Sequence, residues 1–206
     1  MLRVLRSLPA YVMAGALLVS GSAIGGAQVE EALAPSVVTV MSRAISDNPV
    51  PARYADGLQV RTWLNAMSPR LANRIPDPRE RLDFLATVHY EATRAGLDPQ
   101  LVLAVIDVES QFRKYAVSAA GARGLMQVMP FWVKQIGLPS HDLFDWRTNV
   151  RYGCTILRFY LDRENGNMAN ALGRYNGSLG RAEYPNRVIR AWRTRWSDAA
   201  GFNVKR

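Results

Sequence analysis

Apolar residues recur at intervals of three and four along most of the chain, which is the periodicity of helices with one buried face. A longer, almost continuous apolar run occupies residues 101–108. The periodic stretches cover residues 59–75, 82–92, 130–137, 149–163, 168–175 and 188–196. No segment shows a strong alternation of apolar and polar residues. The pattern therefore predicts an all-α fold, with at most a small β element in the loop Ser118–Met129.

Capping residues mark the start of two of these helices. Asp77 is followed directly by proline and three residues later by glutamate, which is a capping-box-like pattern. Asp98 is also followed directly by proline, and Gly96 just before it suits the end of a helix. We therefore expect two consecutive helices, the second of which leads to Glu109.

Residues 1–27 differ in kind from the rest of the chain. Arg3 and Arg6 precede an uncharged run over residues 8–24, and small residues follow it. This order of basic, apolar and small segments is typical of a secretory signal peptide. We expect export to the periplasm or cell envelope, a mature chain that begins near Gln28, and no stable membrane insertion after cleavage. An uncleaved anchor is the alternative, since the run approaches the ~20 residues that a membrane span needs.

The remainder divides into three parts by its sequence signals. Residues 28–78 carry several prolines and are interpreted as a linker or helical extension, of which residues 59–75 are expected to pack on the main domain. Residues 79–197 hold the main helical domain, and residues 198–206 form a short tail.

Composition narrows the possible partners and cofactors. The 206 residues carry a formal net charge of +9, but no run of Lys or Arg exceeds two, so no nucleic-acid partner is expected. The single cysteine, Cys154, cannot form an internal disulfide and lies in a helical apolar pattern, so we expect it in the core. One cysteine and two distant histidines, His89 and His141, give no metal-ligand spacing. We expect a monomer without metal or cofactor.

Glu109 is the main candidate for catalysis. It follows the apolar run directly and shares a helix face with Val105 and Ile106, so its carboxyl is expensive to ionise. A raised pKa suits a general acid near neutral pH. Asp107, two residues earlier, is expected to face away and to be structural. The glycine-rich loop 119–124 allows close approach of the backbone to a ligand.

The motifs in this order resemble those of the lytic transglycosylases of the soluble, SLT-domain type, relatives of goose-type lysozyme. The resemblance covers about residues 83–196. Its markers are Glu109-Ser110, the run 118–127 (SAAGARGLMQ) with Met129-Pro130, Asn149, Gly153 and Tyr175-Asn176. The family usually has alanine before Tyr-Asn and Ala-Gly after it, whereas this chain has Arg174 before and Gly177-Ser178 after. Arg174 is either a solvated residue or a partner for a substrate carboxylate.

The resemblance implies a role for each matched residue within a lysozyme-like catalytic domain. Glu109 is expected to be the single catalytic acid and base. Ser110 is expected to orient groups near it, and the hydroxyl of Tyr175 to point at its carboxyl. The expected substrate-binding residues are Met126, Gln127 and Asn176. From the residues themselves, an apolar methionine can lie against a pyranose face, and an amide suits the N-acetyl and hydroxyl groups of a sugar.

The implied reaction is cleavage of the β-1,4 bond between N-acetylmuramic acid and N-acetylglucosamine in peptidoglycan glycan strands, with 1,6-anhydromuramoyl ends. Most glycosidases use two carboxyls about 5–9.5 Å apart. Among the acids from residue 98 onward, only Glu183 is placed to approach the substrate, and it is expected as a further substrate-binding residue. Its flexible surroundings do not suit a precise nucleophile, so a substrate-assisted route is expected. The alternatives are a lysozyme-type hydrolase, a non-catalytic peptidoglycan-binding protein, and an exported helical domain with an unrelated partner.

Overall fold

The computed structural model describes residues 27–46, 50–51 and 53–197. Within these ranges the chain forms eight α-helices and no strand, so the predicted all-α fold is confirmed. The helices are α1 (Pro35–Ile45), α2 (Leu58–Leu71), α3 (Pro78–Arg94), α4 (Pro99–Glu109), α5 (Phe131–Ile136), α6 (Trp146–Arg163), α7 (Met168–Asn176) and α8 (Glu183–Ala191). Two short helical turns, η1 (Tyr54–Asp56) and η2 (Trp192–Trp196), complete the list.

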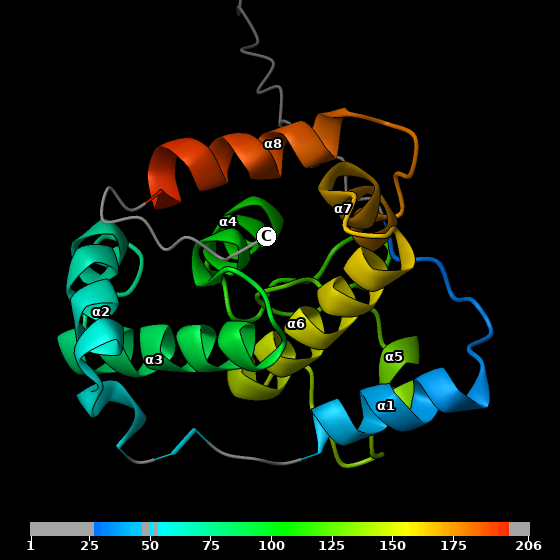
Figure 1. The fold of residues 1–206 in the computed structure, drawn as a ribbon, viewed down its shortest axis with the longest axis horizontal. Helices are drawn as coiled ribbons and strands as arrows, with labels where there is room; N and C mark the ends of the chain where they lie inside the picture. The colour runs from blue at the N-terminus through cyan, green and yellow to red at the C-terminus, as the bar shows by residue number, and fades with distance from the viewer. Residues whose placement is uncertain (1–26, 47–49, 52, 198–206) are drawn as a thin grey trace, which may run out of the picture.

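Helix α4 lies near the centre of the molecule, with α3, α6 and α8 around it (Figure 1). It contacts α3 on one side and α8 with η2 on the other. Every residue from Pro99 to Asp107 is buried. This position explains the apolar run, because a helix covered on several sides needs apolar residues on nearly all of its faces.

The predicted caps are present. The carboxylate of Asp77 accepts a hydrogen bond from the backbone N–H of Glu80 at 2.8 Å. The carboxylate of Asp98 accepts one from the N–H of Gln100 at 2.7 Å and so starts α4. Helix α6 begins three residues earlier than predicted, because Asp145 caps it by accepting from the N–H of Thr148.

The segment between residues 28 and 78 is more ordered than its weak sequence signals predict. Both α1 and α2 contribute to the common hydrophobic core, through Met41 and Ile45 from α1 and Trp63 and Met67 from α2. Helix α1 packs on α5 and α6, and α2 packs on α3. The expected packing of residues 59–75 on the main domain is therefore confirmed. Of the two interpretations of the preceding segment, linker or helix, α1 shows that part of it is helical.

The small β element is reduced to two isolated bridges, which pair Arg123 with Val117 and with Val128. The predicted signal peptide and C-terminal tail lie outside the described residues, apart from Ala27. Within the described part, no helix combines the length and the apolar character that crossing a membrane requires.

Candidate active site

A cleft of about 740 Å³ opens at the C-terminal end of α4. Its walls come from the loop that follows α4, from the end of α7 and from the first turns of α8. Glu109 lies in this cleft, together with Gln127, Asn176, Tyr184 and Arg187. Elements distant in sequence therefore bring an acid, two amides, a phenol and a guanidinium to one place.

Glu109 is the last residue of α4, and its side chain is largely buried in the cleft. Burial raises the pKa of its carboxyl to about 7, and this effect exceeds the opposing effects of Tyr184, Arg187 and Asn176, which favour the charged form. Near neutral pH the carboxyl therefore holds a proton for much of the time and can give it up readily, as a general acid must.

The tyrosine that contacts the carboxyl is Tyr184, not Tyr175 as predicted. The hydroxyl of Tyr184 donates to Oε1 of Glu109 at 2.6 Å. The hydroxyl of Tyr175 donates instead to the backbone carbonyl of Met126 at 2.7 Å. Tyr184 lies in the first turn of α8, which packs on α4, whereas Tyr175 on α7 is fully buried and faces the loop that contains Met126.

Sequence reasoning missed Tyr184 because the last helix was expected to start at residue 188. The helix begins at Glu183, with proline at its third position, and its buried stripe is Tyr184, Val188 and Ala191. This spacing of four and three residues was the available signal, and it places Tyr184 on the face that packs against the core.

The prediction that Met126 lines a sugar subsite is wrong. Its side chain is fully buried and packs on α6. A Cβ added to Gly153 would lie 2.3 Å from the sulfur of Met126 and 2.7 Å from its Cβ, so only glycine allows α6 to approach this closely. Met126 is thus a packing residue that holds the loop on the domain.

Gln127 does line the cleft, with its side chain fixed from within. The backbone at Gln127 has a positive φ of 50°. Its Nε2 donates to the carbonyls of Ala116 and Gly124, at 3.2 and 2.9 Å. The same side chain therefore links the segment before the glycine-rich loop to the last residue of that loop, and it forms part of the cleft wall.

An unpredicted contact fixes this wall from the N-terminal side. Gln28 is buried, and its Nε2 donates to the backbone carbonyl of Gln127 at 3.3 Å. Its Oε1 accepts from the N–H of Met129 and from Nε1 of Trp132, both at 3.1 Å. The first residues that the structure describes are therefore part of the support of the cleft.

The remaining predicted site residues separate into two groups. Asn176 is buried, lines the cleft and interacts with the carboxyl of Glu109. The hydroxyl of Ser110 is buried and donates to the carbonyl of Ile106 at 3.2 Å, so it closes the end of α4 and does not face the cleft. Glu183 is exposed at the start of α8 and does not line the cleft, contrary to the expectation that it could approach the substrate.

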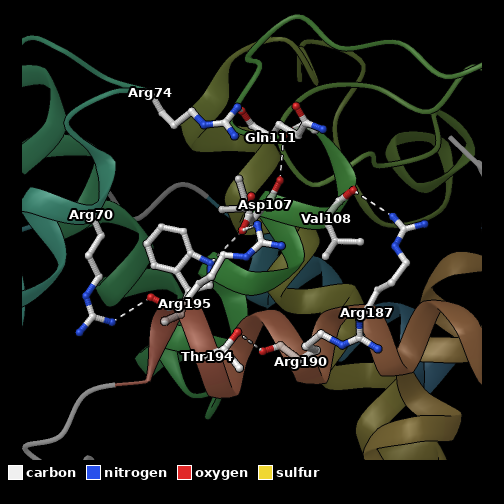
Figure 2. A network of polar contacts seen from close by, with 12 residues as sticks. Arg70, Arg74, Asp107, Val108, Gln111, Arg187, Arg190, Thr194 and Arg195 are labelled. Carbon is white, nitrogen blue, oxygen red and sulfur yellow. Dashed lines mark hydrogen bonds and ion pairs between the residues drawn. The ribbon is translucent and has the colours of Figure 1, made fainter. Parts of the chain in front are cut away.

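Asp107 is structural, as predicted. Its buried carboxylate accepts from Nη1 of Arg195 at 2.7 Å and from Nε1 of Trp196 at 3.2 Å. Figure 2 shows the contact between Asp107 and Arg195, which joins α4 to η2. The pairing fixes η2 against the end of α4.

Two further predictions concern Cys154 and Arg174. Cys154 is buried in the core, as expected. Arg174 is partly exposed, and its guanidinium is paired with Glu164 and Glu31 instead of being free for a substrate carboxylate. Within the described residues, no group of three or more His, Cys, Asp or Glu side chains could hold a metal ion.

The cleft therefore presents one carboxyl among its described lining residues. A single acid with a raised pKa can donate a proton and then accept one, but a second carboxylate for a nucleophile is not among these residues. This arrangement therefore allows a reaction in which one protein carboxyl transfers the protons and a group of the substrate takes the place of a second carboxylate.

Two curated proteins that are similar in sequence are named as transglycosylases. The chain is 33% identical over 116 residues to the transglycosylase of Enterobacteria phage PRD1, covering 53% of this chain and 43% of that protein. It is 35% identical over 113 residues to the membrane-bound lytic murein transglycosylase C of Yersinia pestis, covering 47% of this chain and 32% of that protein. The match thus spans less than half of the length of either relative.

Two solved structures match part of the chain. An inactive mutant of the lytic transglycosylase Slt from Pseudomonas aeruginosa is 24% identical with a TM-score of 0.42, over 80% of this chain and 32% of that one. The 70-kDa soluble lytic transglycosylase of Escherichia coli is 22% identical with a TM-score of 0.42, over 77% and 27%. The family model of the transglycosylase SLT domain matches residues 86–190, just over half of the chain. This protein therefore belongs to the transglycosylase SLT-domain family.

Proposed function

We propose that this chain is a lytic transglycosylase, which cleaves the β-1,4 bond between N-acetylmuramic acid and N-acetylglucosamine in peptidoglycan and leaves 1,6-anhydromuramoyl ends. The observation that carries the proposal is the single largely buried carboxyl, Glu109, with a pKa of about 7 in an open cleft. The family membership and the relative named a lytic murein transglycosylase support it.

The first step is protonation of the leaving oxygen. Protonated Glu109 donates its proton to the glycosidic oxygen, and the bond from that oxygen to C1 of the muramoyl residue breaks. The 2-N-acetyl group of the same sugar stabilises the positive charge that develops at C1. No second protein carboxylate is needed for this step.

The second step uses the carboxylate that the first step produces. The hydroxyl of Tyr184 and the charge of Arg187 stabilise the ionised form of Glu109. The carboxylate takes the proton from the 6-hydroxyl of the muramoyl residue, whose oxygen attacks C1 and closes the anhydro ring. Glu109 is then protonated again, and no water is consumed.

The mass of the product tests this proposal. Digestion of purified sacculi should release muropeptides about 18 Da lighter than the corresponding hydrolysis products, because ring closure omits one water. Mass spectrometry of the digest measures this directly. Mainly reducing ends would instead indicate a lysozyme-type hydrolase with a recruited water.

The pH dependence of the rate tests the role of Tyr184. Because Glu109 acts first as an acid, kcat/KM should fall as pH rises through about 7. Tyr184→Phe removes a hydrogen bond that favours the carboxylate, so the pKa of Glu109 rises and the midpoint of this fall should move upward by about one unit.

Tyr175→Phe is the matched control for this shift. It removes the hydroxyl that bonds the carbonyl of Met126, and this group makes no hydrogen bond to Glu109. We expect a loss of stability of about 1–3 kcal/mol with an unchanged midpoint. Equal midpoints in wild type and Tyr184→Phe would contradict the assigned role of Tyr184.

We also propose a cellular setting on sequence grounds. The signal-peptide pattern over residues 1–27 supports export to the periplasm, and the relative named membrane-bound supports a location at the envelope. The extension 28–78, the catalytic domain 79–197 and the tail 198–206 would then form the mature, monomeric enzyme.

A further inference from the structure

Two arginines hold the backbone on both sides of Glu109. Nε of Arg113 donates to the carbonyl of Ser110 at 3.0 Å. Nη2 of Arg187 lies 3.5 Å from the carbonyl of Val108, and Figure 2 shows this contact reaching from α8 to the end of α4. The guanidinium groups are therefore tethered to the residues immediately after and before the acid.

When Glu109 is protonated, neither arginine has an acidic partner among the described residues of the cleft. Both line the cleft and are exposed, and neither forms an ion pair within the described part of the chain. Lys114, the other base of the cleft, is by contrast paired with Glu80. Since a guanidinium has five N–H donors and the tethers use few of them, both arginines keep donors for a ligand.

The local charge favours an anion. The only acid among the described residues that line the cleft is Glu109, which is protonated for much of the time near neutral pH. The cleft therefore carries net positive charge when the enzyme is ready to donate its proton. Charge-assisted bonds from planar guanidinium groups to a carboxylate are strong and directional.

The proposed substrate offers such a group at the right place. Muramic acid differs from glucosamine by a lactyl group on O3, which ends in a carboxylate or in a peptide that bears carboxylates. C3 and the reacting C1 belong to the same six-membered ring. The O3 substituent is therefore held within one ring width of the bond that is cleaved, where side chains beside Glu109 can reach it.

We propose that Arg113 and Arg187 form a carboxylate-binding pair that recognises the 3-O-lactyl substituent of the muramoyl residue beside Glu109. This inference rests on the proposed function and adds a basis for substrate selection. Muramoyl glycans bind better than chitin oligosaccharides of equal length, because the latter have no carboxylate.

Binding without turnover tests this pair. The Glu109→Gln variant is titrated by calorimetry with three tetrasaccharides: a peptide-bearing glycan, the same glycan after amidase removal of the peptide, and chitotetraose. The measurement is repeated after adding Arg113→Gln and Arg187→Gln together. Arg190→Gln is the control, because it removes one charge from the same helix, exposed and outside the cleft.

The double arginine variant should bind carboxylate-bearing glycans about tenfold or more weakly, and chitotetraose within about twofold of its parent. The loss should shrink in high salt. Weakening with both muramoyl ligands assigns the lactyl carboxylate, and weakening with the peptide-bearing ligand alone assigns the peptide carboxylates. Equal losses on all three ligands, or no loss on any, overturn the proposal.

A failure here can be told from a failure of the proposed reaction. If the wild type releases anhydromuropeptides from sacculi but the arginine variant binds like its parent, only the carboxylate pair is wrong. If the variant discriminates between ligands but the wild type releases no anhydro product, the recognition stands and the reaction is wrong.

Discussion

Glu109→Gln should lower kcat on purified sacculi by about 10²–10⁴-fold, the usual contribution of a general acid. Glutamine keeps the shape of the protonated side chain, and its carbonyl oxygen can still accept from Tyr184, so the fold and the cleft should persist. Release of soluble muropeptides over time measures the rate. Glu183→Gln is the matched control, because that carboxylate is exposed and lies outside the cleft, and its rate should stay near wild type.

The same substitution should stabilise the protein at alkaline pH. The pKa of Glu109 is about 7 in the folded chain against an ordinary value of 4.5, so ionisation is unfavourable in the native state. The stability contributed by the protonated group is complete below about 4.5 and is lost as pH rises through about 7. Glutamine avoids this loss, which is of the order of 1–3 kcal/mol.

Thermal unfolding at two pH values measures this second effect. At pH ~5 the two proteins should unfold at similar temperatures, and at pH ~8 the Gln variant should unfold several degrees higher. Loss of activity together with higher stability at alkaline pH is the signature of a buried catalytic acid. A Gln variant that digests sacculi at the wild-type rate would show that the site assignment is wrong.

The features that sequence predicted well are local in the chain. The apolar run 101–108 followed by Glu109 is one helix, so burial of the helix implies a costly charge at its end without knowledge of any other element. The caps at Asp77 and Asp98 likewise involve residues two or three positions apart. Such features can be read because the interacting groups are close in sequence.

The features that sequence missed depend on how distant elements pack. Tyr175 and Tyr184 are both tyrosines near Glu109, and only the packing of α8 on α4 decides which hydroxyl meets the carboxyl. Gln28 contacts residues about one hundred positions later in the chain, and the residues next to it in sequence give no sign of this contact.

Met126 shows a further limit of reasoning from residue type. A methionine beside a glycine-rich loop is equally suited to a sugar surface and to a protein core. Gly153 decides the matter, because the space left by its missing side chain is filled by Met126 from across the domain. The pair was visible in the sequence as two family markers, but their contact was not.

Asn149 holds the same loop in place through hydrogen bonds from its side chain. Its side chain is fully buried. Oδ1 accepts from the N–H of Met126 at 2.8 Å, and Nδ2 donates to the carbonyls of Arg123 and Leu143 at 2.8 and 2.9 Å. One side chain therefore satisfies three backbone groups that have little access to water, which is costly to undo.

Asn149→Ala should destabilise the protein by about 3–5 kcal/mol, because each buried backbone group left unpaired costs about 1–3 kcal/mol and partial relaxation recovers some of it. For a chain of this size the unfolding temperature should fall by roughly 10 °C. Turnover should also fall, since the loop that carries Gln127 loses its anchor on α6. Thermal unfolding and digestion of sacculi below the new transition measure the two effects separately.

Asn170→Ala is the control for this loss. Asn170 is exposed on α7, and its Nδ2 donates to the carboxylate of Glu164 at 3.0 Å in an exposed contact. Its replacement should therefore change the free energy of unfolding by no more than ~0.5 kcal/mol. A comparable small change for Asn149→Ala, with turnover intact, would mean that Met126 and Gly153 alone fix the loop. The expected large difference between two asparagines of the same domain would show that the cleft is held open by a buried polar anchor beneath it as well as by apolar packing.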